Sequence, residues 1–104
     1  MASQPALKTI EARQQPRDEV CYRARGFTAA RERLPLHVVN TSVGGFMART
    51  EAEHAQGERV SLILPVVGEV DATIRWALGG RIGCQFDRAI EPLVYRAMLT
   101  ALQR

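Results

Sequence analysis

Apolar and polar residues alternate in short runs between residues 20 and 87, and segments rich in glycine, proline or polar residues separate these runs. Alternation with a period of two is typical of strands that have one face in a core and the other in water. It predicts six strands, over residues 20–24, 34–39, 46–49, 59–64, 70–77 and 82–87. Short strands at such regular spacing favour a small antiparallel barrel or sandwich, with Trp76 and Phe86 on inward faces.

The period changes near the C-terminus, where apolar residues recur at the i, i+3, i+4, i+7 spacing of an amphipathic helix. We expect this helix over about residues 91–102, with Pro92 acceptable because it lies in the first turn. The apolar stripe comprises Ile90, Leu93, Val94, Ala97, Met98, Ala101 and Leu102. It must be buried against the sheet or against another subunit, so a monomer and a homodimer both remain open. The predicted class is all-β with a C-terminal helix.

One domain is expected, because 104 residues with 46% hydrophobic content suit a single modest core. Residues 1–12 are weakly patterned and include Pro5, which predicts a flexible N-terminal arm. The domain proper then spans residues 13–104 and begins with a polar segment that contains Pro16.

Composition leaves an anionic partner open and argues against several classes of function. The formal net charge is +3, which permits such a partner without requiring one. Cys21 and Cys84 form no C-x-x-C pair, and neither histidine has a close ligand spacing, so we predict no metal and no cofactor. The recognised catalytic motifs are absent, which predicts that the protein is not an enzyme.

Two further patterns bear on location. No apolar run approaches the length that spans a bilayer, and residues 1–11 lack the basic-then-apolar layout of a signal peptide. We therefore expect a cytoplasmic protein without a membrane span.

Residues 39–45 lie between two apolar runs and are rich in residue types that favour turns, namely Asn, Ser, Thr and Gly. Asn and Ser can bond to nearby backbone, and two consecutive glycines allow positive φ, so a tight turn is predicted. Asn40 and Ser42 also place an amide beside a hydroxyl, while Gly44 and Gly45 leave the backbone open to a flat polar ligand. The segment is thus either a turn that caps its own backbone or part of a binding site.

Two arginines four residues apart, Arg13 and Arg17, stand in the polar segment before the first strand. Each guanidinium can bind a phosphate, or the O6 and N7 edge of guanine, through two hydrogen bonds. Taken alone, such a pair is most often a solvated run of charge.

Together, Arg13-x-x-x-Arg17, Asn40-x-Ser42-x-x-Gly45, the six-strand pattern and the closing helix resemble the PilZ domain over about residues 12–102. The resemblance implies a six-stranded antiparallel PilZ-type β-barrel that acts as a receptor for the bacterial second messenger cyclic di-GMP. Asn40 replaces an aspartate that is frequent in the family. Pro16, inside the arginine motif, departs from many members and stiffens the arm.

By this resemblance, Arg13 and Arg17 would lie on an arm that wraps the ligand and bonds guanine edges and phosphates. Asn40 and Ser42 would meet another guanine from the barrel surface, and Gly45 would avoid a collision with the ligand or a misdirected corner. Ligand binding would order the arm and alter a surface that a downstream protein recognises. Ala12, before the motif, leaves open whether one ligand or an intercalated pair binds.

Two other functions remain open. A PilZ-like domain could act as a protein-interaction module with weak or no nucleotide binding. A small basic β-barrel could instead bind RNA or DNA, but this chain lacks the exposed aromatic series on which such barrels stack bases, so we predict no nucleic acid polymer as a partner.

Overall fold

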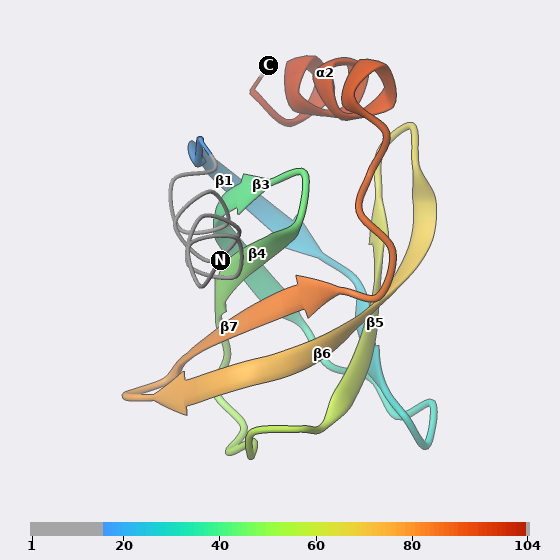
Figure 1. Cartoon of the computed structure of the whole chain (residues 1–104). Helices are drawn as coiled ribbons and strands as arrows, with labels where there is room; N and C mark the ends of the chain where they lie inside the picture. Colours follow the sequence, from blue (N-terminus) through green and yellow to red (C-terminus); the bar gives the residue numbers. More distant parts are fainter. Residues whose placement is uncertain (1–15, 104) are drawn as a thin grey trace, which may run out of the picture.

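The computed structural model describes residues 16–103. Within this range one antiparallel sheet has the strand order β1-β3-β4-β7-β6-β5-β2, and a helix follows it. The elements are β1 (Asp18–Ala24), β2 (Gly26–Thr28), β3 (Leu36–Ser42), β4 (Gly45–Arg49), β5 (Arg59–Leu64), β6 (Gly68–Leu78), β7 (Arg81–Phe86) and α2 (Pro92–Leu102). The sheet is strongly curled, and α2 lies across one end of it (Figure 1). The predicted class, all-β with a C-terminal helix, is confirmed.

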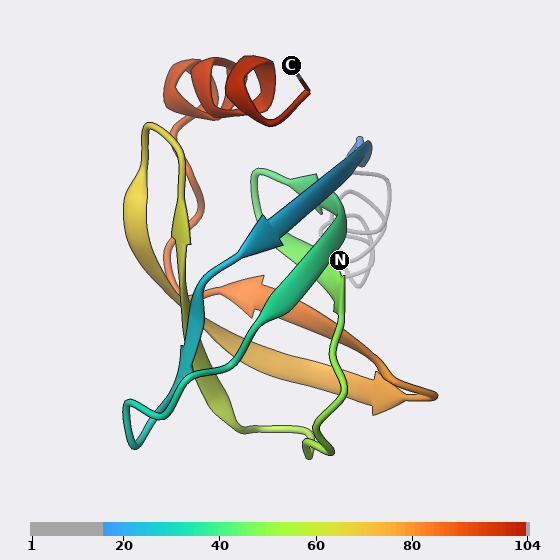
Figure 2. The same ribbon diagram turned by 180° about the vertical axis from the view of Figure 1, so that it is seen from behind.

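The sheet curls round on itself because its two outermost strands are consecutive in the chain. β1 pairs with β3 and β2 pairs with β5, yet only Arg25 separates β1 from β2. The Arg25 carbonyl accepts a hydrogen bond from the Ile63 amide, with an N···O distance of 3.0 Å. Figure 2 shows β1 running directly into β2 along one side of the molecule. The predicted count of six strands holds only if β1 and β2 are taken as one bent strand.

Most of the predicted strand limits agree with the structure to within two residues, and the differences have local causes. The first predicted strand ended too early, because β2 continues the chain to Thr28. The second began too early, since β3 starts at Leu36 and the Leu34 amide donates instead to the Gly26 carbonyl at 2.8 Å. Pro35 between them has no amide hydrogen for a strand ladder.

The core fills the inside of the curled sheet. Phe46 and Phe86 pack together with their ring centroids 5.6 Å apart. Besides Phe46, the apolar side chains with no more than 2% exposure are Leu36, Val38, Ala48, Val60, Leu62, Ala72, Ile74, Ile82 and Met98. They come from β3, β4, β5, β6, β7 and α2, so the alternation in the sequence places its apolar set inside, as predicted.

Trp76 is an exception, because the prediction that it faces inward is wrong: its side chain is 44% exposed. The register between β6 and β7 shifts between Ile74 and Trp76, and such a bulge reverses the alternation beyond it. The indole therefore lies on the outer face of the sheet and covers Gly83, where a Cβ atom would be 2.1 Å from the indole Nε1.

The helix α2 begins at a clear cap, since the Glu91 carboxylate accepts hydrogen bonds from the amides of Leu93 and Val94. The predicted apolar stripe is wrong for these two residues, whose side chains are 74% and 37% exposed. The helix is rotated so that its buried residues are Tyr95, Met98 and Leu102. In this orientation Tyr95 also makes a polar contact with the barrel, described below.

Candidate functional site

The corner between β3 and β4 is a turn that caps its own backbone. The Ser42 hydroxyl accepts a hydrogen bond from the Gly44 amide at 3.2 Å, and the Thr41 hydroxyl donates to the Gly45 carbonyl at 3.0 Å. Ser42 is only 5% exposed. The two glycines of the corner would allow positive φ, but neither adopts it, because the described glycines with positive φ are Gly57, Gly68, Gly79 and Gly80.

Gly45 has a packing role that its place in the motif did not reveal. A Cβ atom at this position would lie 2.2 Å from the Cys84 carbonyl oxygen and 3.3 Å from the Gln85 Cα. Both contacts are with the backbone of β7, so only glycine allows β4 and β7 to pair this closely. The structure thus supplies a reason for Gly45 that needs no ligand.

The structure brings Arg17 of one motif to Asn40 of the other. The Arg17 Nη1 donates a hydrogen bond to the Asn40 Oδ1 at 3.0 Å, across 23 positions of sequence. The pairing of Asp18 with Thr41 in the β1–β3 ladder explains this contact, because it places Arg17 beside the end of β3. Arg13, and with it the predicted arm over residues 1–12, lies outside the described residues.

Sequence reasoning missed how the C-terminal segment fixes the corner. The Tyr95 hydroxyl of α2 donates to the Asp18 Oδ2 at 2.5 Å and lies 3.1 Å from the Thr41 carbonyl oxygen. Burial, and then the hydrogen bond to the Asp18 carboxylate, raise the pKa of Tyr95 above its ordinary value. Asp18 follows Arg17 directly, so Tyr95 holds both sides of the Arg17–Asn40 contact. No sequence signal marked Tyr95, because it lies outside the predicted apolar stripe.

Another feature that sequence reasoning missed is the position of Trp76 relative to this corner. The residues that lie opposite one another on β3, β4, β7 and β6 are Asn40, Met47, Gly83 and Trp76. Neighbouring strands are about 4.8 Å apart, so the backbone of Trp76 lies about 14 Å across the sheet from Asn40, and its exposed indole lies nearer, over Gly83. The outer face beside the corner therefore offers an amide, a guanidinium and a flat aromatic surface. The bulge that turns Trp76 outward leaves no mark in the alternation of the sequence.

Within residues 16–103, no group of three or more His, Cys, Asp or Glu side chains is placed to hold a metal ion. No helix in the described range is long and apolar enough to cross a membrane.

Comparison with known proteins agrees with the motifs and with the fold. The family model of the PilZ domain matches residues 11–102, which include both motifs and every strand and helix described above. No curated protein matches the sequence.

Proposed function

Because the chain belongs to the PilZ domain family, we propose that it is a bacterial receptor for cyclic di-GMP, with its site at the corner between β3 and β4. The observation that carries the proposal is the hydrogen bond between Arg17 and Asn40, since it joins the arginine motif to the corner motif in the folded chain. The proposed ligand-binding residues are Arg13, Arg17, Asn40, Ser42 and Gly45.

The chemistry of the corner suits a guanine nucleotide with phosphate groups. A guanidinium has five N–H donors, of which Arg17 uses one on Asn40, so the others can reach a phosphate oxygen or the O6 and N7 atoms of guanine. The Asn40 amide nitrogen is a further donor, and its oxygen can accept from guanine N–H groups. Gly45 acts indirectly in this proposal, because it allows the corner to sit tightly on β7.

The proposed output is mechanical and needs no catalytic step. In this proposal the ligand bridges Arg13 and Arg17 to the corner and thereby orders the N-terminal arm against the barrel. The ordered arm changes a surface that a downstream protein recognises. Cyclic di-GMP is made inside bacteria, so the proposal includes a cytoplasmic location and no bound cofactor.

Isothermal titration calorimetry with cyclic di-GMP tests the proposal directly. Wild type should bind with a measurable heat, and the titration also gives the number of ligands per chain. Arg17→Ala should weaken binding about tenfold to hundredfold, because a hydrogen bond to a charged group is worth about 1.5–3 kcal/mol. Arg25→Ala is the matched control, since Arg25 is also exposed but lies at the break between β1 and β2.

The outcomes separate the proposed receptor from the alternative of a protein-interaction module. Loss of affinity in Arg17→Ala but not in Arg25→Ala supports the receptor. Equal heats from all three proteins would place the ligand elsewhere. A wild type that gives no heat, and no rise in melting temperature at saturating ligand, would favour the interaction module.

A further inference from the structure

Four basic side chains lie opposite one another on the outer face of the sheet. The register pairs Arg23 of β1 with His37 of β3, His37 with Arg49 of β4, and Arg49 with Arg81 of β7. We call these four residues the basic row, and at about 4.8 Å per strand it spans about 14 Å. None of the four takes part in a salt bridge within residues 16–103. Arg49 and Arg81 are like charges placed directly opposite one another, which destabilises a sheet. His37, whose Nε2 lies 3.2 Å from the Cys21 Sγ, separates them from Arg23. The three arginines therefore point to an anionic partner.

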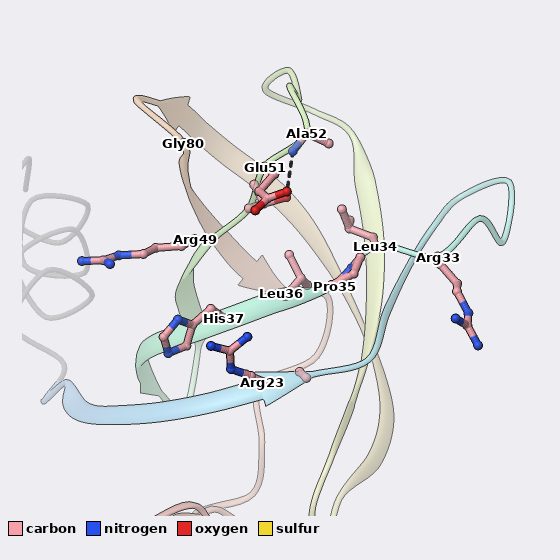
Figure 3. A pocket seen from close by; sticks show the side chains of 12 residues that line it. Arg23, Arg33, Leu34, Pro35, Leu36, His37, Arg49, Glu51, Ala52 and Gly80 are labelled. Carbon is pink, nitrogen blue, oxygen red and sulfur yellow. Dashed lines mark hydrogen bonds between the residues drawn. The ribbon is translucent and has the colours of Figure 1, made fainter.

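Part of the basic row borders an open hollow at the end of the barrel away from α2. The hollow has a volume of about 800 Å³, and Arg23, His37 and Arg49 line it together with apolar residues that include Leu34 and Leu36. Figure 3 shows Arg23 beside His37, with Arg49 extending toward the same side. Glu51 is the acidic residue in the lining. A single carboxylate leaves the net charge of this lining positive.

Exposed apolar side chains continue the basic row at its β6 end. Leu78 pairs with Arg81 across the β6–β7 hairpin and is 80% exposed, the highest value among the large exposed hydrophobic residues of the described chain. Trp76, two residues away on the same outer face, is 44% exposed. The tip of this hairpin projects beyond the rest of the barrel in both views (Figure 1, Figure 2). The apolar side chains of Leu78 and Trp76 and the basic row thus lie on the same face of the sheet.

We propose that this face binds peripherally to an anionic lipid surface. The basic row would lie over the negatively charged headgroups, and Leu78 and Trp76 at the hairpin would enter the headgroup region. Arginines near an anionic leaflet gain from its negative surface potential, and tryptophan is favoured at membrane interfaces because one ring carries an apolar body and a polar N–H. This inference uses a different set of residues from the proposed nucleotide site and does not depend on cyclic di-GMP binding.

The composition of the face favours lipid over a nucleic acid polymer. Proteins that bind single strands without sequence preference stack successive bases on several aromatic side chains, whereas this face carries the single tryptophan of the chain. Leu78 has no π-face for a base, and its side chain at the hairpin is 80% exposed. An aliphatic side chain there gains free energy by leaving water for a lipid interface.

Co-sedimentation of the full chain with lipid vesicles tests the proposal, and the fluorescence of Trp76 reports on the contact. Vesicles of phosphatidylcholine with about one third phosphatidylglycerol should bind the protein and shift its emission to the blue; pure phosphatidylcholine should do neither. Arg49→Gln with Arg81→Gln should weaken binding about thirtyfold, because each arginine near the surface contributes about fivefold. Leu78→Ser should also weaken binding, without effect on the fold of so exposed a position.

A matched control shows whether the position of the arginines matters, and not only the net charge of the protein. The double variant Arg88→Gln with Arg96→Gln also removes two positive charges, but from exposed positions outside the basic row. It should bind anionic vesicles as strongly as wild type does. No binding to anionic vesicles, equal binding to neutral ones, or an equal loss in the control would overturn the proposal. Binding of a thymidine oligonucleotide that depends on Arg49 and Arg81, with no vesicle binding, would assign the face to nucleic acid instead.

Discussion

Replacing Gly45 by alanine asks whether the last glycine of the corner motif serves the fold or the ligand. The added Cβ would lie 2.2 Å from the Cys84 carbonyl oxygen and 3.2 Å from the Cys84 carbonyl carbon. Ordinary van der Waals contact begins near 3.4 Å, so β4 and β7 must move apart by about 1 Å where Gly45 faces Cys84. We therefore expect a loss of stability in the protein without any ligand.

The magnitude follows from what resists the movement. β7 is paired on both sides, with β4 and with β6, so its backbone cannot shift without straining two ladders. Overpacking costs about 1–3 kcal/mol, and a clash with backbone belongs near the top of that range. A loss of about 3 kcal/mol would lower the Tm of a domain of this size by about 15 °C. The protein should still fold, because domains have stabilities of about 5–15 kcal/mol.

Urea denaturation of the ligand-free protein measures this cost, and Gly83→Ala provides the matched comparison. A Cβ at Gly83 would meet the Trp76 side chain at 2.1 Å, but an exposed indole can swing away where a backbone cannot. Gly83→Ala should cost about 1 kcal/mol and change the emission of folded Trp76, whereas Gly45→Ala should leave that emission unchanged. The reasoning fails if Gly45→Ala is within about 0.5 kcal/mol of wild type, or if both variants cost the same.

The remaining predictions concern Tyr95 and the two cysteines. Tyr95→Phe removes the hydroxyl that Asp18 and the Thr41 carbonyl share, and should lower the free energy of unfolding by about 1–3 kcal/mol in chemical denaturation. Burial raises the pKa of the Cys84 thiol from an ordinary 9.0 to about 12, so its contribution to stability is complete below about pH 9 and is lost as the pH rises toward 12. Cys84→Ala should flatten this alkaline decline in denaturation midpoints, and at about pH 8 a thiol reagent should modify the exposed Cys21 well before Cys84.

The parts of the fold that the sequence predicted correctly are those that periodicity alone determines. Residues 59–64 were predicted as a strand, and β5 occupies the same range, because every second residue, Val60, Leu62 and Leu64, is apolar and buried. β2 was missed because three residues carry no period; its conformation depends on pairing with β5, which lies more than thirty positions away. The outward turn of Trp76 was missed because one bulged residue reverses every later side chain without changing the composition.

The candidate site shows the same division between local and long-range causes. The residue types of the corner indicated a self-capping turn, and the Ser42 hydrogen bond confirms it. The freedom of glycine to adopt positive φ is not used in this turn; the short contact with β7 is what demands glycine at position 45. The contact between Arg17 and Asn40 depends on the β1–β3 register, which motif spacing suggests but cannot fix.

Hydrogen bonds connect the corner between β3 and β4 to the C-terminal segment of the chain. The Thr41 carbonyl accepts a hydrogen bond from the Tyr95 hydroxyl. The next two carbonyls of the corner that are bonded to this segment are those of Val43, which accepts from the Ile90 amide, and Gly44, which accepts from the Phe86 amide. The corner therefore cannot move relative to β7 and α2 without straining at least one of these bonds. A ligand that draws Arg17 away from Asn40 would act next to Asp18, whose carboxylate is the other partner of Tyr95. The Tyr95 hydroxyl and the Gln103 side-chain amide, which donates to the Glu19 carbonyl at 3.2 Å, both link the C-terminal segment to β1. Tyr95→Phe removes the first of these links, so it tests whether the link affects ligand response as well as stability.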